Sequence, residues 1–292
     1  GYTQEELETY FGERIDEMSP DFGGREALLT KIKQWYNGYS WDTKNFVYNP
    51  FSILGFFDKR SFENFWFETG TPTFLLKTLN REKQYNLDNI RSTALTFGSF
   101  ELGNITPEAL LFQTGYLTLK AVDKRGVYTL SYPNLEVKDS LLQYLLAEYS
   151  HESLTYVSPR VVTMLEALEA HQVDEFVNTL NSLFASIPYQ IFIAHVEAYY
   201  HSVTFLALSL MGSFVQVEAS QAKGRPDAVV HTDDCIYVME FKLDENAEAA
   251  MQQIKERGYT KPYLHLGKPV KAVGINFNSS KKEVDQWLEE KV

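Results

Sequence analysis

The sequence predicts a multidomain protein with a helical N-terminal region, a winged-helix-like middle and a C-terminal α/β domain with a mixed sheet. Three observations support this fold class. Apolar residues recur at helical spacing through the first domain, a hairpin pattern lies between two helices in the second, and strand and helix patterns alternate from residue 188. We therefore divide the 292 residues into domains 1–90, 91–187 and 188–292.

The composition describes an acidic globular chain. Hydrophobic residues make up 44% of it, and its one cysteine, Cys235, excludes an internal disulfide or a multi-cysteine zinc site. The net charge of −12 has the wrong sign for non-specific binding of nucleic acid, so such binding requires a local basic patch. The longest apolar run, 203–212, is too short for a membrane span, and no signal peptide opens the chain. We expect a cytoplasmic protein without a membrane partner.

The N-terminal domain, 1–90, reads as a series of amphipathic helices. Thr3 and Glu6 have the spacing of a capping box, which predicts that the first helix begins there. A second apolar stripe over 28–36 ends at the turn signal Asn37-Gly38. The many aromatic side chains are expected in the core. Two proline-containing pairs punctuate shorter helices: Asn49-Pro50 and Thr71-Pro72.

The middle domain, 91–187, has a helix–hairpin–helix order. Thr106-Pro107 opens a short helix, strands over 116–121 and 127–131 flank a turn, and Asn134 caps a longer helix. This order is winged-helix-like, a fold that often binds DNA. Because the segment has few basic residues, we favour a structural or protein-contact wing over DNA binding. A helical hairpin over 158–186, broken near 171–174, follows.

The C-terminal domain, 188–292, has the predicted order α-β-β-β-α-β-α. Its first helix carries apolar residues from Val196 to Leu210, and its last is predicted from a capping box at Ser280 and Glu283 followed by Val284, Trp287 and Leu288. Between them, a helix over 247–258 separates strand-like runs, namely 214–219, 225–231, 235–243 and 273–277.

The hairpin formed by the second and third strands brings two acidic residues together. If Asp233-Asp234 is a two-residue loop, counting back along both strands sets Asp227 opposite Glu240. A four-residue loop keeps this register, whereas a loop with an odd number of residues would shift it. Residues in opposed positions have Cβ atoms about 5 Å apart. Lys242 shares a strand face with Glu240, so two carboxylates and an ammonium group would converge.

This convergence has two interpretations. Two neighbouring carboxylates repel each other unless a proton or cation lies between them, and oxygen ligands suit Mg²⁺. A metal held there lowers the pKa of bound water and stabilises charge on a phosphoryl oxygen, while Lys242 orients that water or stabilises the transition state. The alternative is a cross-strand salt bridge on a solvated sheet face. The apolar neighbours of Lys242 argue against exposure of that face.

These residues resemble a known signature. Pro226-Asp227 with Glu240-Phe241-Lys242 resembles the PD-(D/E)XK motif of the restriction-endonuclease-like superfamily, whose common core has a similar order of elements. The wider pattern is similar to the nuclease-like C-terminal domain of the bacterial predicted AAA-ATPase family. The residues that carry this similarity are Glu197, Glu218, Gly224-Arg225 and Gln253-Ile254. Upstream segments resemble the middle region of the same family: 35–39, 47–50, 113–118 and 133–137.

The resemblance implies roles for individual residues. Asp227, Glu240 and Lys242 would be catalytic, and Asp227, Glu240 and Glu197 would hold Mg²⁺ or Mn²⁺. Further residues that would line the site are Gln253, Glu218 and Arg225. His201, four residues after Glu197, is interpreted instead as a hydrogen-bonding core histidine.

The family's ATPase core has no counterpart in this sequence. No G-x-x-x-x-G-K-[ST] motif occurs, so this chain alone should not hydrolyse ATP. We expect a fragment of a longer protein whose N-terminal ATPase domain is its partner and binds the ATP, with residues 1–90 resembling the end of an ATPase lid. 

Two functions remain open at this point. The first is a metal-dependent hydrolase that cleaves nucleic acid, with DNA as the expected substrate, coupled to the ATPase. The second is a non-catalytic nuclease fold kept for binding or regulation, which the acidic charge favours.

Overall fold

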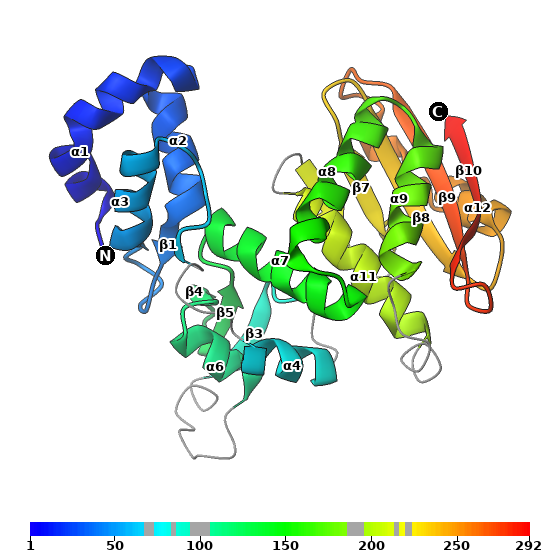
Figure 1. The fold of residues 1–292 in the computed structure, drawn as a ribbon, viewed down its shortest axis with the longest axis horizontal. Coiled ribbons are helices and arrows are strands. Elements are labelled where there is room, and N and C mark those ends of the chain that lie inside the picture. Colours follow the sequence, from blue (N-terminus) through cyan, green and yellow to red (C-terminus); the bar gives the residue numbers. More distant parts are fainter. Residues whose placement is uncertain (67–72, 83–85, 94–105, 186–195, 213–215, 220–223) are drawn as a thin grey trace. The chain divides into compact units, whose positions relative to one another are not determined.

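The protein is described by a computed structural model that covers residues 1–66, 73–82, 86–93, 106–185, 196–212, 216–219 and 224–292 (Figure 1). The chain divides into two compact units, Gly1–Leu141 and Leu142–Val292, which are described in turn. The boundaries of the three domains predicted from the sequence stay a prediction.

The first unit opens with helices whose ends follow the sequence signals. Thr3 Oγ1 accepts a hydrogen bond from Glu6 N at 3.2 Å, and Glu6 Oε2 accepts one from Thr3 N at 2.8 Å, which confirms the capping box. The second helix ends at Tyr36, and Asn49 caps the third. The described helices that begin in this unit are α1 (Gln4–Met18), α2 (Arg25–Tyr36), α3 (Pro50–Lys59), α4 (Thr73–Glu82), α6 (Pro107–Gln113) and α7 (Leu135–Ser150).

Aromatic side chains form much of the core of α1–α3, as the composition predicts. Tyr36 and Phe56 are fully buried, and Phe62 packs against both rings. The Tyr36 hydroxyl also donates a hydrogen bond to the Glu63 carbonyl, so its one polar group is satisfied.

Short strands join distant parts of the first unit. β1 (Asn37–Tyr39) pairs with β2 (Val47–Tyr48), and β3 (Ile90–Thr93), β5 (Val127–Ser131) and β4 (Thr118–Val122) form an antiparallel sheet in that order. The β4–β5 hairpin confirms the predicted strands around residues 123–126, and the Thr106 cap of α6 is present as well. The winged-helix assignment stays a prediction, and strands β1–β3 were not predicted.

The second unit places helices on both faces of a mixed sheet. Strands β8 and β9 are parallel and the other neighbouring strands are antiparallel. The described strands follow the order β10 (Glu283–Lys291), β9 (Val270–Asn278), β8 (Ile236–Leu243), β7 (Ala228–His231) and β6 (Gln216–Ala219). Its helices are α8 (Leu154–Glu169), α9 (Val173–Ala185), α11 (Val196–Met211) and α12 (Ala247–Arg257), together with the end of α7.

The two faces of this sheet are covered differently. Phe277 of β9 packs against Phe184 of α9 and Tyr200 of α11. Gly274 points to the opposite face, where α12 crosses β8 and β9. The predicted helical hairpin is present as α8 and α9, with its break at 170–172, and it lies in this unit.

The predicted last helix is wrong, since residues 283–291 form strand β10. A bulge at Asp285 shifts the register, so Val284 opposes Phe277 while Trp287 opposes Ile275. Both therefore face the same side of the sheet although they are three residues apart, which imitates helical spacing. The supposed capping box lies in a turn instead, where Asn278 Oδ1 accepts hydrogen bonds from Ser280 N and Lys281 N at 3.0 Å.

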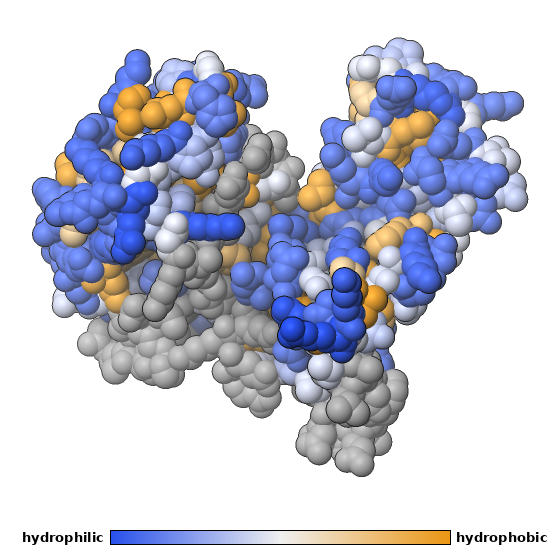
Figure 2. All heavy atoms as spheres, turned by 180° about the vertical axis from the view of Figure 1, so that it is seen from behind, coloured by the Kyte–Doolittle hydropathy of each residue, from blue (hydrophilic) through white to orange (hydrophobic). Residues whose placement is uncertain are grey.

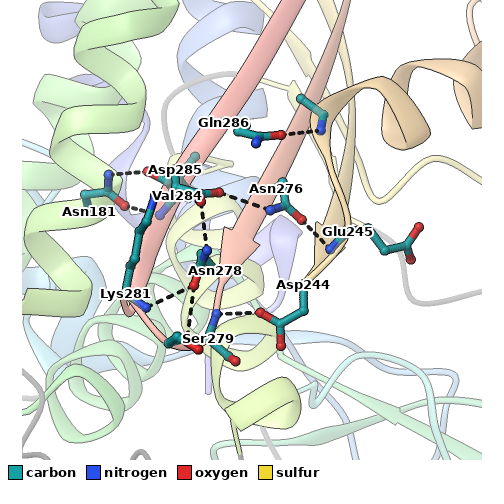
Figure 3. A network of polar contacts seen from close by, with 12 residues as sticks. Asn181, Asp244, Glu245, Asn276, Asn278, Ser279, Lys281, Val284, Asp285 and Gln286 are labelled. Carbon is teal, nitrogen blue, oxygen red and sulfur yellow. Dashed lines mark hydrogen bonds and ion pairs between the residues drawn. The ribbon is translucent and has the colours of Figure 1, made fainter.

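A polar network ties this hairpin to its neighbours (Figure 3). Asn181 of α9 exchanges two hydrogen bonds with the backbone of Val284, at 2.7 and 3.0 Å. Asn276 Oδ1 accepts from Glu245 N at 3.0 Å, and Asp244 Oδ1 accepts from Ser279 N at 2.7 Å. The chain that leaves β8 is thus held in place just after Lys242.

None of the described helices has the length and apolar character that crossing a bilayer requires. On the face seen in Figure 2, hydrophilic residues cover most of the described surface, and hydrophobic ones gather only in small separate areas.

Candidate functional site

The β7–β8 hairpin has the register that the sequence predicts. Ala228 pairs with Met239 and His231 with Ile236, so Asp227, directly before β7, falls opposite Glu240. The loop is the four-residue form closed by His231 and Ile236. Asp227 Oδ2 accepts a hydrogen bond from Phe241 N at 2.8 Å, which fixes this carboxylate against β8.

Glu240 is the centre of the cluster and is only 3% exposed. Its Oε1 accepts hydrogen bonds from the amide Nε2 of Gln253 and, at 3.5 Å, from Lys242 Nζ. Lys242 Nζ also donates to Gln253 Oε1 at 2.6 Å. The second carboxylate oxygen, Glu240 Oε2, is buried and has no hydrogen-bond partner among the described residues. An unpaired buried carboxylate oxygen is costly unless a proton or cation binds it.

Gln253 reaches this cluster because α12 lies very close to the sheet. Gly274 is the register neighbour of Glu240 in β9. A Cβ atom at Gly274 would lie 2.6 Å from Ala247 O and 2.9 Å from Met251 N of α12. Its backbone needs no positive φ, so the glycine is required here for the close approach of the helix.

The electrostatics of the two carboxylates reflect burial and mutual repulsion. Burial, and secondarily the charge of Asp227, raises the pKa of Glu240 to about 7. Burial also raises the pKa of Asp227, against the lowering effects of the Phe241 N–H, His201 and Lys242. A cation bound between the two would remove both penalties on their ionised forms.

The donor set fits a hard divalent cation. It offers carboxylate oxygens, one of which is buried and has no partner in the described part of the chain, and Mg²⁺ commonly uses one or two carboxylates while keeping several waters. Within the described ranges, no group of three or more His, Cys, Asp or Glu side chains is placed to hold a metal. The described residues that could hold the ion are therefore Asp227 and Glu240.

A pocket opens beside these residues, between α11 and the β7–β8 strands. Asp227, Phe241 and Lys242 line one side, and His201 and Thr204 of α11 line the other. His201 is exposed, so its interpretation as a core histidine is wrong. The sequence signal that could have found it is its position one turn after Glu197 on the helix that precedes the hairpin.

Of the remaining predicted site residues, the side chains of Gln253 and Arg225 are described and those of Glu197 and Glu218 are not. Gln253 joins the cluster directly. Arg225 is exposed, and among the described residues it makes no hydrogen bond or ion pair with the cluster. Glu197 lies on α11 and Glu218 on β6, but their side chains fall outside the described residues.

Comparison with known proteins agrees with this geometry. The chain is 36% identical over 295 residues to "Uncharacterized protein in vnfD 5'region" of Azotobacter chroococcum mcd 1, an alignment that covers 97% of this chain and 55% of that protein. The chain thus spans about half the length of this relative. No solved structure matches. Residues 195–287, which include Asp227, Glu240, Lys242 and Gln253, match the family described as PD-(D/E)XK nuclease superfamily, and this segment is a domain of that superfamily.

Proposed function

We propose that residues 195–287 hydrolyse phosphodiester bonds in nucleic acid, with DNA as the substrate and Mg²⁺ or Mn²⁺ as the cofactor. The observation that carries the proposal is the cluster of Asp227, Glu240, Lys242 and Gln253, in which one buried oxygen of Glu240 has no hydrogen-bond partner among the described residues. Nucleases of this superfamily generally use divalent metals, which fits this donor set.

Each residue has a separate role in the proposed reaction. Asp227 and Glu240 hold the metal, and Glu197 is proposed as a further ligand. The bound ion supplies an acidified water and a positive charge beside the phosphoryl oxygen. Lys242 orients the attacking water or stabilises the negative charge that develops on the phosphate. Gln253 holds Lys242 and Glu240 in their relative positions, and Glu218 and Arg225 are proposed to lie along the substrate path.

We further propose that this domain works together with an ATPase in a longer cytoplasmic protein. The support is the resemblance of the upstream segments to the bacterial predicted AAA-ATPase family and the greater length of the relative. The sequence contains no P-loop motif, so the proposed ATP site lies outside this chain.

The alternative is a non-catalytic nuclease fold that binds a partner or regulates the ATPase. The net charge of −12 favours it, because nucleic acid is repelled by an acidic protein. The presence of Asp227, Glu240 and Lys242 together in one cluster favours a catalytic nuclease over a non-catalytic fold.

Cleavage and metal binding decide between the two functions. The purified chain is incubated with single- and double-stranded DNA and with RNA, in Mg²⁺, in Mn²⁺ and with a chelator. We expect slow cleavage that the chelator abolishes. Asp227→Asn should weaken metal binding in calorimetry, whereas Lys242→Ala should abolish cleavage and leave metal binding nearly intact.

The matched control is Asp233→Asn, which changes an exposed carboxylate in the turn of the same hairpin. It should leave metal affinity and cleavage unchanged. A wild-type chain that neither binds metal nor cleaves any substrate establishes the non-catalytic alternative. Equal cleavage by wild type and both site variants would identify a contaminating nuclease.

A further inference from the structure

One face of α11 forms a wall of the pocket beside the two carboxylates. The residues of this helix that line it are Tyr200, His201, Thr204, Phe205 and Leu208, and their spacing places them on adjacent turns of one helix face. Phe205 and Leu208 are apolar and the Tyr200 ring stacks on Phe277, so the polar groups on this wall, besides the Tyr200 hydroxyl, belong to His201 and Thr204. Lys242 and Asp227 lie on the sheet side of the same pocket.

The side-chain polar groups of His201 and Thr204 make no hydrogen bonds that hold the described part of the fold together. The His201 ring has no hydrogen-bond partner among the described residues, and its side chain is exposed. Thr204 is only 4% exposed, and its buried hydroxyl has no partner among the described residues. A buried hydroxyl without a partner, on the same wall as an exposed ring, indicates that a polar ligand completes this pocket.

The chemistry of the pocket favours an anion. The His201 ring lines the same pocket as the ammonium group of Lys242, so two N–H donors from opposite walls border one space. Lys242 donates to Gln253 and Glu240, which leaves one N–H of its ammonium group for a phosphate oxygen, and a donor on the α11 wall would hold a phosphate oxygen from the other side. An imidazole ring carries an N–H donor in both its neutral and its charged form. This role therefore does not depend on titration of the ring.

We propose that His201 is a substrate-binding residue that donates a hydrogen bond to a non-bridging oxygen of the phosphate lying between α11 and Lys242. Thr204 completes the same wall, with its hydroxyl turned to the bound strand or to a water that the strand holds. This inference rests on the proposed nuclease function and names a residue through which the site recognises phosphate.

The first test compares histidine variants on the full chain. His201→Ala should lower kcat/KM for DNA cleavage in Mn²⁺ about tenfold to a hundredfold, the range for a hydrogen bond to a charged group, with most of the loss in KM. His201→Gln, which keeps an N–H donor, should recover part of the loss. The matched control His265→Ala removes an exposed histidine in a loop and should behave like wild type. Thermal melting checks that each variant folds.

The second test asks whether the ring contacts the phosphate itself. Binding of an oligonucleotide is measured in Ca²⁺, with one non-bridging oxygen at the cleaved linkage replaced by methyl, in each diastereomer. One diastereomer should weaken binding to wild type and have no further effect on His201→Ala, since both changes remove the same contact. Additive losses for both diastereomers would overturn the proposal.

The outcomes separate this inference from the function on which it rests. If wild type cleaves and His201→Ala cleaves equally well, the role of His201 is overturned and the nuclease function stands. Equal losses in His201→Ala and His201→Gln with unchanged oligonucleotide affinity would also overturn it, since they indicate a structural role. If wild type neither binds nor cleaves nucleic acid, both proposals fail.

Discussion

Glu240 and Gly274 are neighbours in the parallel pair β8 and β9, and the absent side chain of Gly274 makes room for the helix that brings Gln253 to Glu240. The glycine touches none of the proposed reacting groups. It allows α12 to lie close to β9, and the hydrogen bond between Gln253 and the Glu240 carboxylate depends on that short distance.

Gly274→Ala should therefore disturb both stability and the site. The new Cβ atom would lie 2.6 Å from Ala247 O, and the backbone of α12 must move away, at a cost of about 1–3 kcal/mol. Urea denaturation measures this cost. Gly12→Ala is the control, because a Cβ atom there meets nothing within 4 Å and should be neutral or stabilising. Equal effects of both substitutions would contradict the close-approach argument.

Gln253→Ala should reduce cleavage without abolishing metal binding. Glu240 and Lys242 both lose a hydrogen-bond partner, and each group gains freedom to leave its position. The expected loss of kcat is about tenfold or more, measured beside metal affinity by calorimetry. Gln252 is exposed, is bonded to Glu256 on the same helix, and provides the control Gln252→Ala. The positioning role fails if the two variants are equally active.

The stability of the second unit should fall as the pH rises in metal-free buffer. The pKa of Glu240 is raised from 4.5 to about 7, so the folded state favours its protonated form. The contribution of Glu240 to the free energy of unfolding is therefore complete below pH 4.5 and is lost as the pH rises through 7. At about 1.4 kcal/mol per pKa unit, this contribution amounts to roughly 3 kcal/mol. Glu240→Gln should flatten this dependence, and Mg²⁺ should restore stability at pH 8. The measurement is the midpoint of urea denaturation at pH 5 and pH 8 for wild type and Glu240→Gln. An equal change of midpoint with pH in both proteins would refute the assignment of this pH dependence to Glu240.

Glu136 should produce a similar dependence in the first unit. It is fully buried, accepts hydrogen bonds from Ser52 Oγ at 2.7 Å and Trp66 N at 3.0 Å, and burial raises its pKa to about 7. Its stabilising protonation is again complete below pH 4.5 and is lost through pH 7. Tryptophan fluorescence in a Trp287→Phe background follows the first unit alone. Glu136→Gln should remove the pH dependence of the stability of the first unit. The same pH dependence in this variant as in the Trp287→Phe background would contradict the role of Glu136.

Asn181→Ala should loosen strand β10. The side chain of Asn181 satisfies both backbone polar groups of Val284, and its loss should cost about 1–3 kcal/mol. Hydrogen exchange at the Val284 amide should accelerate. Asn178→Ala, on the exposed side of the same helix, should leave that amide protected. A Val284 amide that exchanges at the wild-type rate in Asn181→Ala would show that other contacts hold the strand.

The sequence predicted the part of the site that the β7–β8 hairpin forms. Asp227 and Glu240 belong to one hairpin, so the even-numbered loop and the alternation of side chains were enough to pair them. Gln253 was named only through resemblance, since its approach depends on Gly274 and on packing that no periodic pattern encodes.

The errors arose where distant segments decide the structure. The bulge at Asp285 gave β10 a helical pattern, and the strand forms because β9 offers it a partner. Strands β1 and β2 are two or three residues long and lack any periodic signal. His201 was interpreted as a hydrogen-bonding core histidine, whereas its side chain is exposed and lines the pocket, a position that depends on how α11 packs against the strands.

The arrangement of the hairpin has a consequence for recombination between related genes. One uninterrupted stretch of chain, from the residue before β7 into α12, carries Asp227, Glu240, Lys242 and Gln253. A crossover on either side of this stretch transfers the two carboxylates, the lysine and the glutamine together. A crossover within it separates groups whose protonation and hydrogen bonds depend on one another, and the hybrid inherits a buried charge without its partners.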